Sequence, residues 1–115
     1  MEARVCSPQI EKALPEKSLN LPPASATINA AALTAVDTET TSLDAMRAEL
    51  VGISLCCEPG HAAYIPVAHR YPGAPEQLSR ERVLAKLRSW LEDPAKPKLG
   101  QHLKYDCHVF ENYGI

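Results

Sequence analysis

Two acidic residues follow an apolar stretch and are separated from each other by one position. Asp37 comes directly after the run Ala30–Val36, and Glu39 follows two positions later. Side chains of a β-strand alternate between its faces, so a strand here turns both carboxylates to the same side. Neighbouring carboxylates repel each other unless a cation lies between them, and divalent ions such as Mg²⁺ prefer carboxylate oxygens. The pair therefore predicts a divalent-metal site.

The alternative is that Asp37 and Glu39 are solvated residues at a strand end, the more common situation for an isolated Asp-x-Glu pair. Their position argues against it, because carboxylates beside a buried stretch are costly without partners. A third carboxylate, Asp106, lies in the first turn of an expected helix that follows a short expected strand. If that strand pairs beside the first, Asp106 reaches the edge of the sheet where ligands gather in open α/β folds. Asp106 equally suits the dipole of its helix, and spacing alone leaves both explanations open.

Three strands are expected in the first half of the domain. They are Ala31–Thr38, Glu49–Cys57 and Ala62–Val67, and the last two are rich in Val, Ile, Leu and Tyr. Glu58-Pro59-Gly60 is typical of a tight turn, so the second and third strands are predicted to form a hairpin.

Two helices and one short strand complete the expected fold. They are a helix capped by Ser79 and running to Glu92 before Asp93-Pro94, a strand at Lys96–Gly100, and a helix at Leu103–Tyr113 capped by Gly114. The apolar residues of the first helix lie on one face. The order strand, strand, strand, helix, strand, helix predicts a mixed α/β fold, an antiparallel meander followed by a crossover to a parallel strand.

The composition changes near residue 30. Residues 1–30 hold four of the ten prolines and no sustained apolar period. They are predicted to be a poorly ordered segment or linker, with a short helix around Ile10–Leu14, and residues 31–115 to be the domain. With 45% hydrophobic and 23% charged residues, the chain is typical of a globular protein, and its net charge of −2 gives no overall basic field. The apolar run Ala30–Val36 is too short to span a membrane and no signal peptide precedes it, so a cytoplasmic protein is expected.

The chain contains four cysteines but no arrangement typical of a metal site. There is no CxxC pair and no zinc-finger spacing of cysteine and histidine. Adjacent residues of a strand point to opposite faces, so Cys56 and Cys57 do not easily bind one ion together. Reduced thiols are therefore expected. The disfavoured alternative is a structural zinc site built from Cys57, His61, His102 or Cys107.

Five segments carry a resemblance to a known family. They are Val36–Thr40 with Ser42–Asp44, Leu50–Ser54, Ala63–His69, Leu78–Arg82 and Gly100–Asp106. In this order and at these separations they closely resemble the 3′→5′ proofreading exonuclease domain of bacterial-type DNA polymerase I, which belongs to the DEDD exonuclease superfamily. The resemblance covers about residues 33–115.

The resemblance implies a ribonuclease-H-like fold in which four acidic residues from three motifs hold two divalent metal ions, Mg²⁺ or Mn²⁺. Asp37 would bridge both ions, and Glu39 would serve the ion on the side of the attacking water. Asp106 would serve the other ion, largely through water. Leu43 resembles the family residue that wedges against the terminal bases. The other matching substrate-binding positions are Thr38, Gln101 and His102.

The implied activity is hydrolysis of the 3′-terminal phosphodiester bonds of single-stranded DNA by a two-metal mechanism. The implied partners are single-stranded 3′ ends and a polymerase domain in a longer parent chain, and a monomer with no membrane partner is expected. A related exonuclease acting on RNA is an alternative, since metal chemistry does not select the sugar. The five polymerase-type segments favour DNA.

The chain departs from the family pattern in two places. His102 stands where some relatives carry Asn, which changes a substrate hydrogen bond but no metal ligand. The family's third motif, with its water-orienting tyrosine and fourth carboxylate, does not occur in these 115 residues. The domain is therefore expected to be incomplete at its C-terminus and inactive alone. The alternative function is that of a non-catalytic fragment that at most binds single-stranded DNA.

Overall fold

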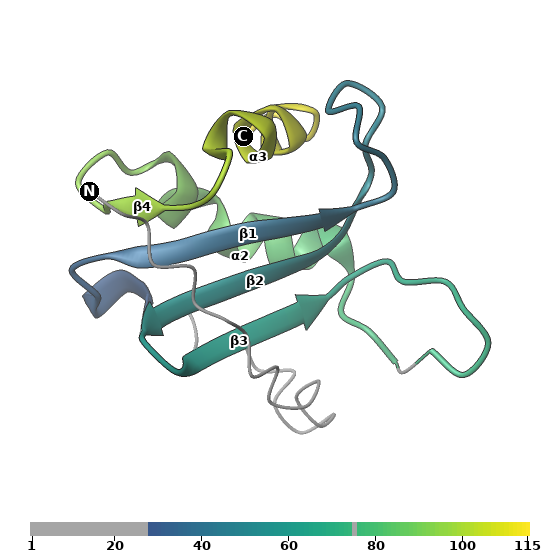
Figure 1. The fold of residues 1–115 in the computed structure, drawn as a ribbon, viewed down its shortest axis with the longest axis horizontal. Helices are drawn as coiled ribbons and strands as arrows, with labels where there is room; N and C mark the ends of the chain where they lie inside the picture. The colour runs from purple at the N-terminus through teal and green to yellow at the C-terminus, as the bar shows by residue number, and fades with distance from the viewer. Residues whose placement is uncertain (1–27, 75) are drawn as a thin grey trace.

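The computed structural model describes residues 28–74 and 76–115 and shows a mixed α/β fold (Figure 1). Its elements are strands β1 (Thr34–Thr40), β2 (Leu50–Glu58) and β3 (His61–Pro66), helix α2 (Arg80–Glu92), strand β4 (Lys98–Leu99) and helix α3 (Leu103–Glu111). This is the predicted order of strand, strand, strand, helix, strand, helix. The predicted fold class is confirmed.

The four strands form one sheet in the order β3-β2-β1-β4. β2 runs antiparallel to both β1 and β3, and β4 pairs in parallel with β1. The β2–β3 hairpin turns at Pro59 and Gly60, and Gly60 has a φ of 85°, which residues with side chains rarely adopt. The predicted meander, turn and parallel strand are all confirmed. β1 thus lies between an antiparallel and a parallel neighbour.

β4 and α3 are shorter than predicted. Instead of Lys96–Gly100, β4 comprises two residues, because the Lys96 N–H donates to the Asp93 carbonyl at 3.1 Å and holds that segment in a turn. α3 ends at Glu111, and the chain leaves it through Gly114 at a φ of 78°, in agreement with the predicted glycine cap. Because β4 is short, the carboxyl-terminal part of β1 has no strand partner on this side.

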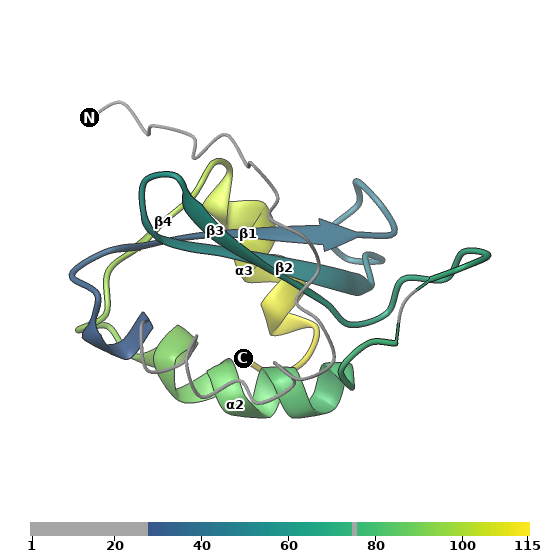
Figure 2. The same ribbon diagram turned by 90° about the horizontal axis from the view of Figure 1, so that it is seen from below.

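α2 lies across one face of the sheet (Figure 2), and α3 contributes buried residues to the same core. α2 begins after Ser79, whose side chain accepts a hydrogen bond from the Arg82 N–H at 3.4 Å, as the sequence predicted. The shared core includes Val83, Leu84, Leu87 and Trp90 of α2, Val109 and Phe110 of α3, and Val36, Leu50, Ile53, Leu55 and Ile65 of the sheet. No helix in the described part of the chain is long and apolar enough to cross a membrane.

The packed region begins before residue 31. Ile28 is 2% exposed and belongs to the core. The predicted boundary between the N-terminal segment and the domain therefore falls inside the packed region. The predicted helix around Ile10–Leu14 and residues 1–27 of the predicted linker lie outside the described residues.

Gly100 allows the segment after β4 to approach β1 closely. A Cβ at this position would lie 2.8 Å from the Val36 carbonyl oxygen and 2.6 Å from Leu103 Cδ2. The Val36 carbonyl is part of the β1 backbone, so it cannot move without disturbing the sheet. Glycine is required here for space.

We expect Gly100→Ala to lower the free energy of unfolding by about 1–3 kcal/mol, because the added methyl group overpacks this contact. Urea unfolding followed by the fluorescence of Trp90 measures the change. The matched control is Lys86→Ala at an exposed position of α2, which should change stability by less than about 0.5 kcal/mol. Equal stability of the two variants would contradict the close approach.

Candidate active site

β1 presents Asp37 and Glu39 on the same face of the sheet, as their spacing predicted. Asp37 pairs with Ser54 of β2, and Glu39 pairs with Gly52. Both acidic residues are exposed, whereas Thr38 between them is buried on the face that packs against the helices. The two carboxylates therefore face outward together, at the carboxyl end of the central strand.

Asp106 of α3 reaches β1 from the side of β4. β4 pairs with β1 only at Thr34 and Ala35, so the Thr38 N–H, which points the same way, lies beyond the end of β4. The Asp106 carboxylate accepts from this N–H at 3.1 Å and from the Thr38 hydroxyl at 2.5 Å. Both bonds converge on Oδ1. Asp106, which is 3% exposed, is thus fixed beside the strand that carries the exposed pair.

The surroundings of Asp106 disfavour its charged form. Burial raises the pKa of the Asp106 carboxyl above its ordinary value, and the negative charge of Asp37 raises it further. The hydrogen bonds from Thr38 act in the opposite direction without cancelling this rise. Asp37 and Asp106 therefore repel each other across β1.

The described residues supply no basic side chain to relieve this repulsion. Their ion pairs join Arg47 to Asp44, Arg88 to Glu92 and His108 to Glu111, and none of them involves Asp37, Glu39 or Asp106. Uncompensated carboxylates of this kind attract hard divalent cations, so the donor set suits Mg²⁺ or Mn²⁺ by its chemistry. In residues 28–74 and 76–115, however, no three acidic, histidine or cysteine side chains already lie close enough together to hold an ion. Holding an ion there would therefore require the carboxylates to move toward one another.

The zinc alternative finds no support in the described residues. Cys57 is half-buried on β2 and Cys107 is exposed on α3. Neither belongs to a group of metal-binding side chains there, and neither forms a disulfide.

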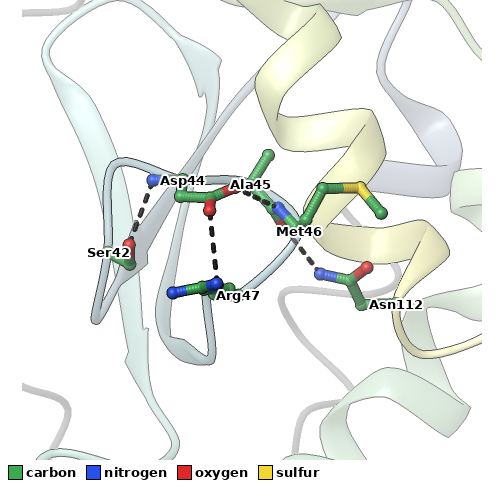
Figure 3. A network of polar contacts seen from close by, with 6 residues as sticks. All are labelled: Ser42, Asp44, Ala45, Met46, Arg47 and Asn112. Atoms are coloured by element: carbon green, nitrogen blue, oxygen red, sulfur yellow. Dashed lines mark hydrogen bonds and ion pairs between the residues drawn. The ribbon is translucent and has the colours of Figure 1, made fainter.

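The loop between β1 and β2 holds Leu43 fully in solvent, with 99% of its surface exposed. Figure 3 shows the polar contacts that brace this loop. The Asp44 N–H donates to the Ser42 hydroxyl at 3.0 Å, and the Asp44 carboxylate accepts from the Met46 N–H at 3.0 Å. Its other oxygen lies 3.7 Å from Arg47 Nε. An apolar side chain is thus displayed on a structured turn.

α3 holds the same loop at two points. The Tyr105 hydroxyl donates to the Ser42 carbonyl and lies 2.5 Å from the Thr40 hydroxyl. The Asn112 side chain donates to the Ala45 carbonyl at 2.7 Å (Figure 3). The sequence analysis assigned no role to Tyr105 or Asn112. The sequence nevertheless held a signal for Tyr105, because this residue directly precedes Asp106 within a resembling segment.

Gln101 and His102 lie in the exposed turn between β4 and α3. His102 is the N-terminal cap of α3 and has a left-handed backbone with φ 55° and ψ 43°. Asn and His are among the few non-glycine residues that favour this region. His102 therefore suits this backbone, and an Asn at this position would keep the backbone while displaying a different side chain.

The structure shows a further residue beside the exposed pair. Tyr64 of β3 pairs with Ser54, which pairs with Asp37, so the three side chains share a face. Burial raises the pKa of the Tyr64 hydroxyl, and the negative charge of Glu39 raises it further. The sequence analysis quoted Tyr64 within a resembling segment but gave it no role. A bulge between Cys56 and Glu58 shifts the β2–β3 register by one residue from the pairing at the turn, so the turn residues alone did not place Tyr64 on this face.

Comparisons with known proteins agree with this architecture. A family model described as a 3′-5′ exonuclease matches residues 15–115. DNA polymerase I of Pseudomonas aeruginosa is 56% identical over 82 residues, which is 71% of this chain and 9% of that protein. DNA polymerase I of Rhizobium leguminosarum is 40% identical over 103 residues, covering 75% of this chain and 10% of that protein.

One solved structure, the POL domain of Pol1 from M. smegmatis in complex with a DNA primer-template and dNTP, has a TM-score of 0.58 to this fold. It is 22% identical and covers 82% of this chain and 15% of that chain, so it supports the fold alone. The chain spans about a tenth of the length of the curated relatives. The resemblance read from the five segments is confirmed by the family match, and the chain belongs to the 3′-5′ exonuclease family.

Proposed function

We propose that this chain is the part of a DNA polymerase I proofreading domain that carries the first two catalytic motifs, and that it acts in the 3′→5′ hydrolysis of DNA ends. The observation that carries this proposal is that two exposed carboxylates on β1 and the buried carboxylate of Asp106 lie along the same strand, in a chain whose family is a 3′-5′ exonuclease. A buried carboxylate next to the charge of Asp37, with no basic partner among the described residues, is costly to a fold. A metal-dependent nuclease requires such grouped carboxylates.

Asp37, Glu39 and Asp106 would hold the divalent ions. Ions bound there would lower the pKa of a water molecule and neutralise negative charge on the leaving 3′ oxygen. Asp37 lies between Glu39 on its own face and Asp106 across the strand, so it is placed to be shared. Thr38 faces the helices and donates both its bonds to Asp106, which supports a role in holding that carboxylate rather than in touching substrate.

The proposed substrate is a single-stranded 3′ end. Leu43 is an exposed apolar side chain on a braced loop next to the end of β1, which suits contact with the flat face of a terminal base. Gln101 and His102, exposed at the start of α3, would offer hydrogen bonds to sugar or phosphate. A polymerase domain in a longer chain would deliver the frayed end, as the full-length relatives suggest.

We expect the Asp37→Ala substitution to abolish 3′→5′ hydrolysis. The host is a chimera in which the matching 82-residue segment of the Pseudomonas aeruginosa DNA polymerase I is replaced by this chain's sequence. Mononucleotide release from a labelled single-stranded oligonucleotide in Mg²⁺ should fall about a thousandfold or more, because both ions lose a ligand. Asp106→Ala should cost several orders of magnitude, and Leu43→Ala less than about tenfold, since Leu43 only positions the end.

The matched control is Glu58→Ala, which removes an exposed carboxylate at the opposite end of β2. It should leave the rate unchanged. An active Asp37→Ala chimera would remove the basis of the proposed function. The isolated chain should release no mononucleotides, and a rate near that of the chimera would show that residues outside the family's third motif supply the missing ligand.

The isolated chain should bind Mn²⁺ only weakly, with a Kd of about 1 mM or higher, or about −4 kcal/mol. The physical reason is that the carboxylates must first approach one another against their repulsion. Nuclear magnetic resonance detects such binding, because Mn²⁺ broadens nearby amide signals. Broadening should centre on Asp37 and Glu39, disappear in Asp37→Ala and persist in Glu58→Ala. Micromolar binding that survives Asp37→Ala would contradict the assigned site.

Asp106→Asn is expected to remove hydrolysis in the chimera while stabilising the chain near neutral pH. The pKa of Asp106 is raised, so the folded chain holds this proton more tightly than the unfolded chain. Wild-type stability therefore falls as pH rises from the ordinary pKa, about 4, through the raised pKa. The amide carries no charge and keeps an oxygen for Thr38. The melting temperature of the variant relative to wild type should rise between about pH 4 and 7, and a constant difference would contradict this electrostatic account.

A further inference from the structure

Gly52 of β2 lies directly beneath the side chain of Tyr64. A Cβ built on Gly52 would fall 1.9 Å from the Tyr64 hydroxyl oxygen, 2.4 Å from Cζ and 2.7 Å from Cε2, and these are the three nearest atoms. Gly52 is not among the glycines with positive φ, which are Gly60, Gly73 and Gly114. The position therefore requires glycine for space and not for backbone conformation. The aromatic ring of Tyr64 occupies the volume of the missing side chain.

This placement brings the ring next to Glu39. The Tyr64 backbone pairs with Ser54, which in turn pairs with Asp37. Gly52 lies two residues before Ser54 on β2 and pairs directly with Glu39. The ring therefore crosses diagonally over β2 toward the Glu39 side chain. The effect of the Glu39 charge on the Tyr64 hydroxyl agrees with this proximity.

Contacts with the loop after β3 hold the ring in place. The Tyr64 hydroxyl forms a hydrogen bond with His69 Nε2. The backbone of His69 is held in turn by Gln77, whose side chain accepts from the His69 N–H at 2.8 Å and donates to its carbonyl at 2.8 Å. The Tyr71 ring meets the His69 ring edge-on at 6.1 Å. The position of the Tyr64 ring is thus fixed both from below and at its tip.

From this geometry we propose that Tyr64 is a positioning residue for Glu39. The sheet order β3-β2-β1-β4 puts the Tyr64 ring on the β2 side of Glu39, and α3 with Asp106 on the other side of β1. The ring prevents the Glu39 side chain from turning toward β2 and leaves it free to turn toward the side of β1 on which Asp106 lies. The inference rests on the proposed function, because it assigns Glu39 to the same ligand set as Asp37 and Asp106.

The physical benefit is a reduction of conformational freedom. A glutamate side chain on an exposed strand surface samples many rotamers, and ordering it on binding costs free energy. A rigid aromatic wall removes some of those rotamers in advance. Misplacement of a reacting group by about 1 Å can cost about a hundredfold in rate, so modest confinement has a large effect. Tyr64 acts through Glu39 and needs no contact with the DNA.

A double-mutant cycle on Gly52 and Tyr64 in the chimera tests this inference. Tyr64→Ala removes the wall and should lower kcat by about 10–100-fold with little change in KM, because DNA contacts are untouched. Gly52→Ala should cause a similar loss, since its Cβ displaces the ring. The double variant should be no worse than Tyr64→Ala alone, because the ring that Gly52→Ala displaces is already absent.

Two conservative variants separate positioning from general damage to the fold. Tyr64→Phe keeps the ring over Gly52 and loses only the bond to His69, so it should retain most of the activity that Tyr64→Ala loses. Tyr113→Phe is the matched structural control, because Tyr113 packs against the core and its hydroxyl accepts from the Leu50 N–H at 2.9 Å, whereas Glu39 faces away from the core. It should lower the melting temperature without changing kcat.

Binding of Mn²⁺ to the same variants, measured by electron paramagnetic resonance, gives a second readout. It should weaken severalfold in Tyr64→Ala and Gly52→Ala and remain unchanged in Tyr113→Phe. Additive losses in the cycle, or unchanged Mn²⁺ binding in Tyr64→Ala, would overturn the inference. If Gly52→Ala does not fold, the contrast between Tyr64→Ala and Tyr64→Phe decides, and equal activities overturn it. If the inference about Tyr64 is overturned but Asp37→Ala still abolishes activity, the proposed function stands.

Discussion

The hydrogen bonds between Thr38 and Asp106 hold the site together. β4 pairs with β1 over only two residues, so the rest of β1 would face the β4 side without a strand partner. The Asp106 carboxylate takes the place of a strand there by accepting the Thr38 N–H and hydroxyl. Hydrogen bonds to a charged group contribute about 1.5–3 kcal/mol each, and an unsatisfied buried donor costs about 1–3 kcal/mol. One carboxylate thus completes the edge of β1, docks α3, and places a negative charge beside Asp37.

These roles have opposite effects on stability. The bonds from Thr38 favour a charged Asp106, but burial and the charge of Asp37 disfavour it more strongly. A carboxylate placed only for stability would have a basic partner, and the described residues provide none for Asp37, Glu39 or Asp106. Natural folds tolerate such repulsion mainly at functional sites, where a ligand relieves it. This electrostatic pattern supports the proposed metal site.

The sequence predicted those features that depend on local patterns. Apolar runs, the turn at Glu58–Gly60 and the cap at Ser79 were sufficient for the order of elements, the hairpin and α2. The predicted extent of β4 was wrong. A hydrogen bond from the Lys96 N–H to the Asp93 carbonyl and the close approach of Gly100 to β1 limit the length of this strand. For Asp106 the spacing allowed either a site residue or a helix-dipole residue. Only the pairing of β4 with β1 shows that its carboxylate reaches the exposed pair's strand. Thr38 was predicted to contact substrate from its place in the motif, and its buried bonds to Asp106 appear only in three dimensions.

A common arrangement places each exposed functional group on or beside β1. Asp37 and Glu39 lie where β1 pairs with β2 on one side and is held on the other side by the bonds from Thr38 to Asp106, and the groups around them are fixed from distant parts of the chain. Leu43 extends from a loop that α3 holds through Tyr105 and Asn112, and the Tyr64 ring rests on Gly52 while His69 holds its tip. In each case a loop or side chain near the proposed site is held by residues from another part of the fold. Such bracing matters most where repulsion between carboxylates would otherwise drive them apart, because the side chains must remain near one another before any cation arrives. The fold around β1 therefore supplies the organisation, and the bound cations would supply the remaining attraction.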